Sequence, residues 1–212
     1  MKTEDLIATL AQDSRTQRGL GPVLAMALLA GLALSICGFV LALGLRQGLV
    51  GALMAPLTLP KVILPPLTAL TALALVARLA HPVARVDGLR AVLRGLAAAA
   101  VLMQIAALIT TPRADWAAAF LGGNDLWPCL VGVPLLSLPM LAGLMLALRH
   151  GATLTPRATG AVAGLAAGAM GASIYALHCP EDSPLFYATW YSVGIAVIAA
   201  LGAYLGPKLL RW

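Results

Sequence analysis

The chain has 212 residues, of which 61% are hydrophobic and only 10% are charged, and its formal net charge is +6. An ordinary globular domain is about half apolar, and about a quarter of its residues are charged. Disordered chains combine low hydrophobicity with high charge. The composition therefore excludes a water-soluble enzyme and a disordered chain, and it predicts an integral membrane protein.

Six stretches between the charged residues are apolar enough to cross a bilayer, which requires roughly 20 apolar residues per helix. They cover approximately residues 20–43, 57–77, 95–110, 126–146, 158–177 and 185–205. The third stretch is short, and the second contains Lys61 near its start, where a long side chain could extend to the membrane surface. We therefore expect an all-α protein, namely a six-transmembrane-helix bundle that forms one domain over residues 20–212.

The basic residues are distributed unevenly between the two sides that six crossings define. Eleven of the 14 Lys and Arg residues fall on the side of the two termini, and only Arg46, Lys61 and Arg113 fall on the other side. Because positively charged loops tend to remain in the cytoplasm, we expect both termini to be cytoplasmic. The charges are scattered over four short segments, so direct nucleic-acid binding is not expected.

The spans contain few signs of transport or catalysis. Their centres lack the ionisable residues that mark transport pathways, and Gln104 in the third span is typical of a contact between helices. Pro65 and Pro66 interrupt the second span, and Pro134 and Pro139 the fourth. Broken helices occur in transporters, but proline is also tolerated in packed membrane helices. Common hydrolase and phosphate-loop motifs are missing, so we predict that the chain is not an enzyme.

Three glycines repeat at intervals of four residues on one face of the fifth span: Gly160, Gly164 and Gly168. Small residues at this spacing allow a second helix to approach closely. We predict that they serve helix packing, either within the bundle or between two copies.

Two cysteines are expected at the same depth on the outer side of the membrane. Cys129 begins the fourth span and Cys179 directly follows the fifth, and these spans should form an antiparallel hairpin. Cys129 lies 20 residues from Arg149, and Cys179 lies 22 residues from Arg157, so the two thiols could reach one disulfide or one metal ion. The third cysteine, Cys37, lies inside the first span and is interpreted as an apolar filler.

Four further side chains near this pair could contribute ligands: Asp125, His178, Glu181 and Asp182. Thiolate, imidazole and carboxylate groups together can bind zinc or a heavy metal. A neighbouring imidazolium could instead lower a thiol pKa and make the thiol redox-sensitive. A plain structural disulfide beside a solvated acidic loop is the third alternative.

Residues 1–19 form a tail before the first span. Thr3 can cap a short helix on which Leu6, Ile7 and Leu10 share one side. So short a helix is marginal alone in water. Its apolar side could bind a groove on a partner protein or lie on the membrane surface.

Several motifs along the chain carry a family resemblance. They are the opening segment from Met1 to Ile7, Trp127-Pro128-Cys129, His178-Cys179-Pro180-Glu181, the pair Trp190-Tyr191, and the closing segment from Gly206 to Trp212. Together they resemble the NrsF-type (negative regulator of sigma F) membrane anti-sigma factors of proteobacteria.

The resemblance implies a function that the composition does not show. It implies that residues 1–19 hold an extracytoplasmic-function sigma factor at the bacterial inner membrane, with Leu6, Ile7 and Leu10 as contact candidates. It further implies that residues 20–212 form a sensor in which Cys129 and Cys179 respond to heavy metals or oxidants. No cofactor is required, although zinc or a heavy metal could bind the two thiols. A small transporter or metal exporter and a membrane thiol oxidoreductase are the alternatives.

Overall fold

The computed structural model describes residues 20–81, 85–123 and 125–210. The tail that carries Leu6, Ile7 and Leu10 lies outside these residues. Six described helices are long and apolar enough to cross a membrane, which confirms the predicted all-α architecture with six spans. They are α2 (Leu20–Ala42), α4 (Leu59–Leu79), α5 (Asp87–Thr110), α7 (Leu126–Leu148), α8 (Pro156–Tyr175) and α9 (Pro184–Leu209).

The predicted third span was too short. Helix α5 begins at Asp87 rather than at residue 95, because its first two turns are amphipathic and carry Arg90 and Arg94. Because the predicted spans are apolar stretches between charged residues, the third one could not extend past Arg94. The short helices α3 (Leu49–Met54) and α6 (Trp116–Leu121) and the 3₁₀ turn η1 (Arg113–Asp115) were also not predicted. All three lie in the connections between spans.

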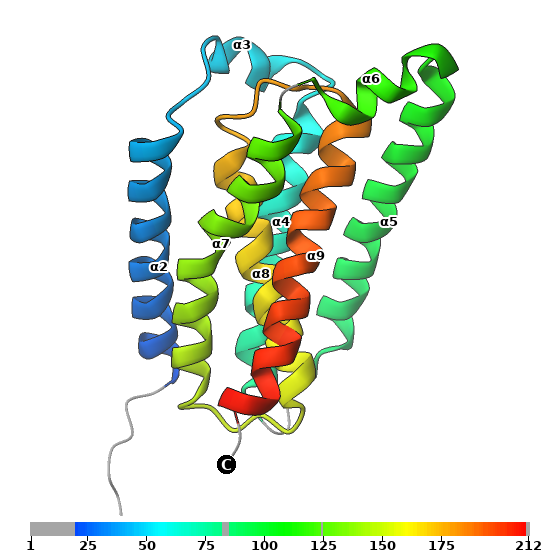
Figure 1. The fold of residues 1–212 in the computed structure, drawn as a ribbon. Coiled ribbons are helices and arrows are strands. Elements are labelled where there is room, and N and C mark those ends of the chain that lie inside the picture. Colours follow the sequence, from blue (N-terminus) through cyan, green and yellow to red (C-terminus); the bar gives the residue numbers. More distant parts are fainter. Residues whose placement is uncertain (1–19, 82–84, 124, 211–212) are drawn as a thin grey trace, which may run out of the picture.

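The bundle is built around α8. Two-thirds of the most apolar window of α8 (67%) is buried, compared with 6% for α5. Helices α4, α7 and α9 pack directly against α8, whereas α2 packs mainly on α7, and α5 lies on the outside against α4 and α9. The centre of the bundle is therefore formed by four spans, with α2 and α5 as its flanks (Figure 1).

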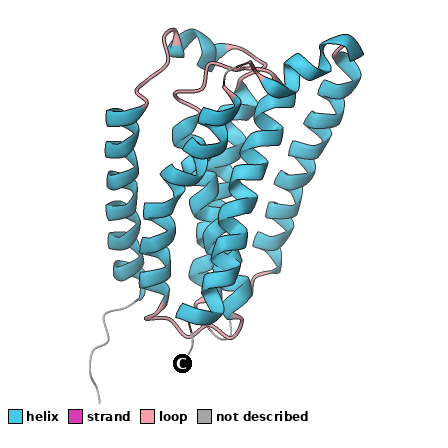
Figure 2. Ribbon diagram, viewed as in Figure 1, coloured by secondary structure: helices cyan, strands magenta, loops and turns pink. Residues whose placement is uncertain are grey.

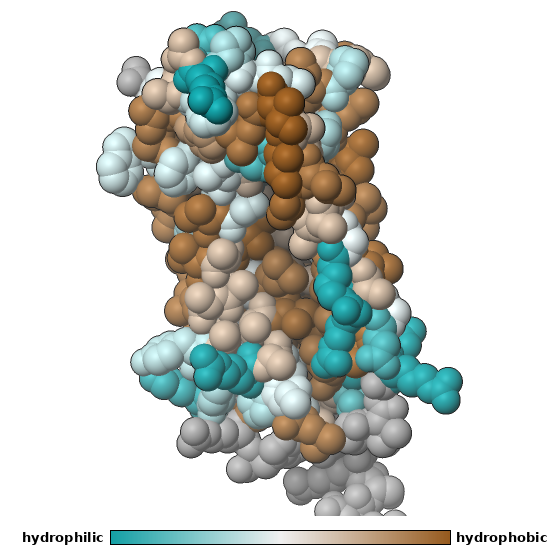
Figure 3. All heavy atoms as spheres, turned by 90° about the vertical axis from the view of Figure 1, so that its right-hand side faces the viewer, coloured by the Kyte–Doolittle hydropathy of each residue, from teal (hydrophilic) through white to brown (hydrophobic). Residues whose placement is uncertain are grey.

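The two ends of the bundle differ in character. Short loops join the helices at both ends (Figure 2), and apolar side chains cover the middle of the face shown in Figure 3, between hydrophilic ends. One end, which we call the basic end, contains the start of α2 and the end of α9. Its described basic residues are Arg78, Arg85, Arg90, Arg94, Arg149, Arg157 and Lys208. The opposite end, called the cysteine end, contains α3, α6 and the loop between α8 and α9.

The prolines do not break the spans that contain them. Helix α4 continues through Pro65 and Pro66, and α7 continues through Pro134 and Pro139. Gln104 of α5 donates through Nε2 to the Thr189 hydroxyl of α9 at 2.7 Å, which confirms the expected contact between helices. The discontinuous helices of the transporter alternative are therefore not found in the described spans.

The glycine face of α8 packs against α9. A Cβ atom added to Gly160 would clash with the carbonyl oxygen of Gly202, and one added to Gly164 would clash with that of Ile198. At Gly168 the nearest atom, Cα of Ile195, would lie 3.0 Å from the added Cβ. All three glycines thus allow the backbones of α8 and α9 to approach within the same chain.

Replacing Gly168 with alanine is expected to lower the free energy of unfolding by about 1 kcal/mol, because α9 must move slightly to accept the methyl group. Thermal unfolding in detergent would measure the change. Gly38→Ala on α2 is the matched control, since a Cβ there has no neighbour within 4 Å. Equal stability of the two variants would contradict this account of the α8–α9 contact.

Candidate functional site

The two predicted cysteines are both fully buried at the cysteine end. Cys129 lies in the first turn of α7, and Cys179 lies in the loop between α8 and α9. Both belong to one apolar core cluster, and they are close enough for the charge of one thiolate to act on the other. Neither forms a disulfide in this structure, and Cys37 is a free, exposed cysteine on α2. The geometry brings together the two cysteines that the sequence singled out and separates them from the third.

Lys61 at the start of α4 holds the backbone that carries Cys179. Its Nζ donates to the carbonyl oxygens of Cys179 at 2.8 Å and Glu181 at 2.7 Å, and to Oδ1 of Asp182 at 3.1 Å. The Lys61 side chain is only 1% exposed, so its ammonium group is enclosed by this loop. The loop after α8 binds at the start of α4 and provides three acceptors, which compensate the ammonium group for its lost water.

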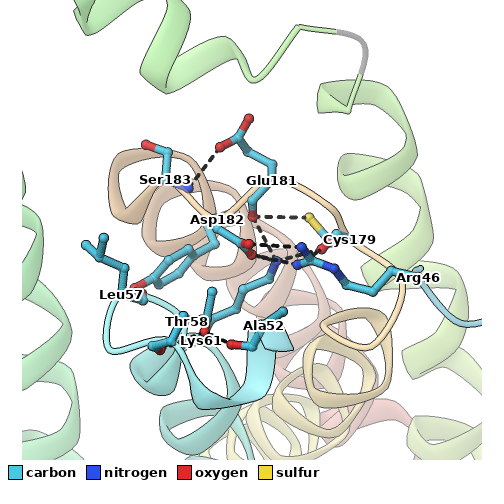
Figure 4. Close-up of polar contacts among 11 residues, drawn as sticks. Arg46, Ala52, Leu57, Thr58, Lys61, Cys179, Glu181, Asp182 and Ser183 are labelled. Carbon is cyan, nitrogen blue, oxygen red and sulfur yellow. Dashed lines mark hydrogen bonds and ion pairs between the residues drawn. The ribbon is translucent and has the colours of Figure 1, made fainter. Parts of the chain in front are cut away.

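Arg46, in the connection between α2 and α3, binds the same loop. Its two terminal nitrogens donate to the two carboxylate oxygens of Asp182 at 2.7 and 3.0 Å, and Nη1 also donates to the Cys179 carbonyl at 3.1 Å. A planar guanidinium matches a carboxylate in this two-point geometry. Figure 4 shows Arg46 and Lys61 meeting at Asp182. We call Arg46, Lys61 and Asp182, with the carbonyls of Cys179 and Glu181, the cation clamp.

The charges of the cation clamp support one another. Partial burial disfavours ionisation of Asp182, but the hydrogen bond from Arg46 and the charge of Lys61 outweigh it and hold the pKa of the carboxyl below its ordinary value. The hydrogen bond to Asp182 in turn raises the pKa of Arg46. The clamp therefore keeps the Asp182 carboxyl ionised and paired near neutral pH.

The end of α2 is positioned so that Arg46 reaches the clamp. Gly44 has a φ of +73°, a conformation that suits glycine, and it turns the chain after α2. Its carbonyl lies 3.0 Å from Nδ1 of His178, and because a carbonyl only accepts, that nitrogen donates. The backbone N–H of Arg46 donates to the carbonyl of Leu177 at 3.1 Å. These two hydrogen bonds, together with those of the Arg46 side chain, fasten the α2–α3 connection to the loop of Cys179.

The two remaining predicted ligands, Glu181 and Asp125, make hydrogen bonds within the protein. Oε1 of Glu181 accepts the backbone N–H of Ser183, just before α9 begins. Asp125 directly precedes α7 and accepts the N–H of Cys129 through its carbonyl. Across the described part of the chain, no three His, Cys, Asp or Glu side chains are grouped so that they could hold one metal ion.

The Cys179 thiol is buried and donates to the carbonyl oxygen of Glu181 at 3.7 Å. Burial raises its pKa, and the charge of Lys61 offsets this only in part. This direction is opposite to the one expected of a thiol activated by an imidazolium. The Tyr191 hydroxyl, in α9, is buried without a hydrogen-bond partner among the described residues. The Tyr191 ring meets that of Tyr175 edge to face, with centroids 6.0 Å apart.

The fold and the site together define a multi-span helical membrane protein with a closed polar cluster beside two buried thiols. The model of a family described as "NrsF: Negative regulator of sigma F" matches residues 10–212. The chain belongs to this family, which is described as one of negative regulators.

Two relatives align over their full length and over the whole chain. One is the "Anti-sigma-F factor NrsF" of Caulobacter vibrioides (strain NA1000 / CB15N), with 36% identity over 220 aligned residues. The other is the "Probable anti-sigma-F factor NrsF" of Azospira oryzae (strain ATCC BAA-33 / DSM 13638 / PS), with 35% identity over 220 residues. No solved structure matches the chain.

Proposed function

We propose that this protein sequesters an extracytoplasmic-function sigma factor at the bacterial inner membrane and releases it when Cys129 and Cys179 react with a metal or an oxidant. The names of the two relatives support an anti-sigma role. In this proposal the tail of residues 1–19 binds the sigma factor through Leu6, Ile7 and Leu10. The spans of residues 20–212 act as the sensor.

The distribution of charge supports the proposed orientation. The basic end carries seven described Lys and Arg residues, whereas the cysteine end carries Arg46, Lys61 and Arg113. Because positively charged loops tend to be cytoplasmic, the basic end faces the sigma factor and the cysteine end faces the oxidising side. The tail joins α2 at the basic end, where its partner is.

The cation clamp is the observation that carries the proposed coupling. The Cys179 thiol lies in the core, whereas the Cys179 carbonyl oxygen accepts hydrogen bonds from Lys61 and Arg46. A metal ion or a disulfide at the thiols requires the Cys179 loop to shift, and the same shift weakens the contacts that hold α4 and the end of α2. A signal at the thiols therefore reaches the helix that leads directly into the tail.

The energy required is moderate. Changing a two-state equilibrium from 99:1 to 1:99 takes about 5.5 kcal/mol of differential affinity. Zinc in zinc-finger peptides, which supply four ligands, binds with about 10–16 kcal/mol at pH 7. A metal ion at the two thiols favours release to the extent that it binds the releasing state more tightly than the resting state.

The proposed sensing is tested by replacing each thiol separately. Cys129→Ser and Cys179→Ser should each reduce induction of a sigma-dependent reporter by metal or oxidant to about a tenth or less, because one remaining thiol cannot form the two-sulfur site. Cys37→Ser is the control, since Cys37 is an exposed cysteine on α2 outside this site. Normal induction in both site variants would limit the pair to a structural role.

A further inference from the structure

A second feature of the molecule lies within the membrane-spanning region. A cavity of about 400 Å³ is bounded by α4, α5 and α9, and its lining includes Leu165 of α8. Its lining is mainly apolar. The Thr68 hydroxyl donates to the carbonyl of Leu64 in its own helix, and the Tyr187 hydroxyl donates to the carbonyl of Leu57. The Tyr191 hydroxyl has no hydrogen-bond partner among the described residues. The cavity therefore offers few free polar groups to an ion or a polar ligand.

The cavity arises because α5 packs loosely against its neighbours. Ala107, near the cysteine end, is the one buried residue of this helix. Along the cavity α5 presents Ala97 and Ala100, and α9 presents Ala196 and Ala199. Side chains this short do not fill the space between two helices.

Because the cavity lies within the membrane-spanning region, the molecules that could fill it are water, a helix of a second copy or a lipid chain. An apolar cavity does not hold water, because water needs two to four polar partners there. A helix from a second copy is about 10 Å across. Along the roughly 15 Å of α5 from Leu93 to Met103, such a helix would occupy about 1,200 Å³. That is about three times the volume of the cavity. A single hydrocarbon chain is thinner than a helix and matches the mainly apolar lining.

Basic residues beside the cavity indicate which kind of lipid headgroup would lie there. Arg90, Leu93, Ala97 and Ala100 follow one another at helical spacing on α5, so Arg90 continues the face that lines the cavity toward the basic end. Arg90 and Asp87 are 4.0 Å apart at their nearest atoms, with half of the Arg90 side chain exposed, so its guanidinium retains donors. Figure 3 shows hydrophilic side chains gathered below the apolar part of this face.

We propose that the cavity between α4, α5 and α9 binds one acyl chain of an anionic phospholipid, whose phosphate is held by Arg90 and Arg94. The inference rests on cavity size, lining and charge, and is independent of the proposed sensing function. Basic sites between membrane helices on the cytoplasmic side are known to bind anionic headgroups. A bound lipid would fill the space that α5 leaves open and fasten this flank to the bundle.

The test uses the full-length protein in detergent and native mass spectrometry with added phosphatidylglycerol or phosphatidylcholine. Ala100→Phe, which fills the cavity, should reduce binding of both lipids at least about fivefold. The double variant R90Q/R94Q should weaken phosphatidylglycerol binding by about tenfold or more and abolish the preference for it. Ala98→Phe on the exposed side of α5 and Arg113→Gln at the cysteine end are the matched controls.

Each outcome bears on one part of the proposal. Binding that survives in a folded Ala100→Phe variant would overturn the cavity as the site, with helicity and thermal unfolding as the check on folding. Equal binding of the two lipids by the parent protein would overturn the anionic headgroup. A dimer that dissociates in Ala100→Phe, without bound lipid in the parent, would identify a second copy as the occupant and contradict the proposal.

Discussion

Replacing Asp182 with alanine is expected to lower the free energy of unfolding by about 3 kcal/mol. The substitution removes the carboxylate that pairs with Arg46 and Lys61, and the Lys61 side chain is almost completely buried. Removing one partner of a buried ion pair typically costs about 3–5 kcal/mol, because an uncompensated charge remains. Asp182 is one-third exposed and Lys61 keeps two carbonyl acceptors, which places the expected loss at the lower end.

A second variant, Lys61→Met, tests how much of this loss comes from leaving the buried ammonium group without its carboxylate. Lys61→Met removes the buried ammonium while Arg46 still holds Asp182, so its destabilisation should be clearly smaller than that of Asp182→Ala. In a reporter assay both variants should raise the uninduced activity of the sigma factor, because both loosen the Cys179 loop. Chemical unfolding in detergent measures the first effect. A more stable Asp182→Ala protein would contradict the assignment of the clamp as a stabilising cluster.

The same carboxylate predicts how stability depends on pH. The pKa of Asp182 is lowered in the folded state, below an unfolded value of about 3.9. Its contribution is therefore fully present above the unfolded pKa and is lost as the pH falls through the folded pKa. The stability difference between the parent and Asp182→Ala should accordingly shrink below about pH 4.

The spans and the cysteine pair could be predicted because they depend on local or nearly local patterns. An apolar stretch of sufficient length predicts a membrane helix. The short turn between α7 and α8 fixes the relative depth of Cys129 and Cys179. The glycine spacing likewise indicated a close helix contact. Its partner, α9, was not predicted, because the spacing describes only one side of an interface.

The cation clamp could not be predicted, because it depends on contacts between distant segments. Arg46 and Asp182 are 136 positions apart, and Lys61 and Asp182 are 121 apart. Arg46 and Lys61 are two of the three basic residues at the cysteine end, and Lys61 lies within a membrane-spanning helix, which was the available signal. Ionisable residues within such helices usually have a specific partner.

Replacing Leu6 and Leu10 with aspartate is expected to abolish sigma-factor binding. In the proposed helix these residues share one apolar side with Ile7, and a charge on that side would be buried without a partner in the complex. Anchoring residues typically contribute 2 kcal/mol or more each, so the double substitution should weaken binding by at least about a hundredfold. Co-purification of the sigma factor from resting cells, followed by titration with purified partner, would measure this.

The control for this prediction adds the same charge to the other side of the helix. Ala8→Asp with Gln12→Asp should leave binding within about threefold of the parent, because at helical spacing both positions lie away from Leu6 and Leu10. Membrane insertion should be normal in both double variants, since the six spans begin at residue 20. Full co-purification by the Leu6→Asp, Leu10→Asp variant would exclude the tail as the anchor and favour a tail that lies on the membrane surface, because the sigma factor would then be held elsewhere on the protein.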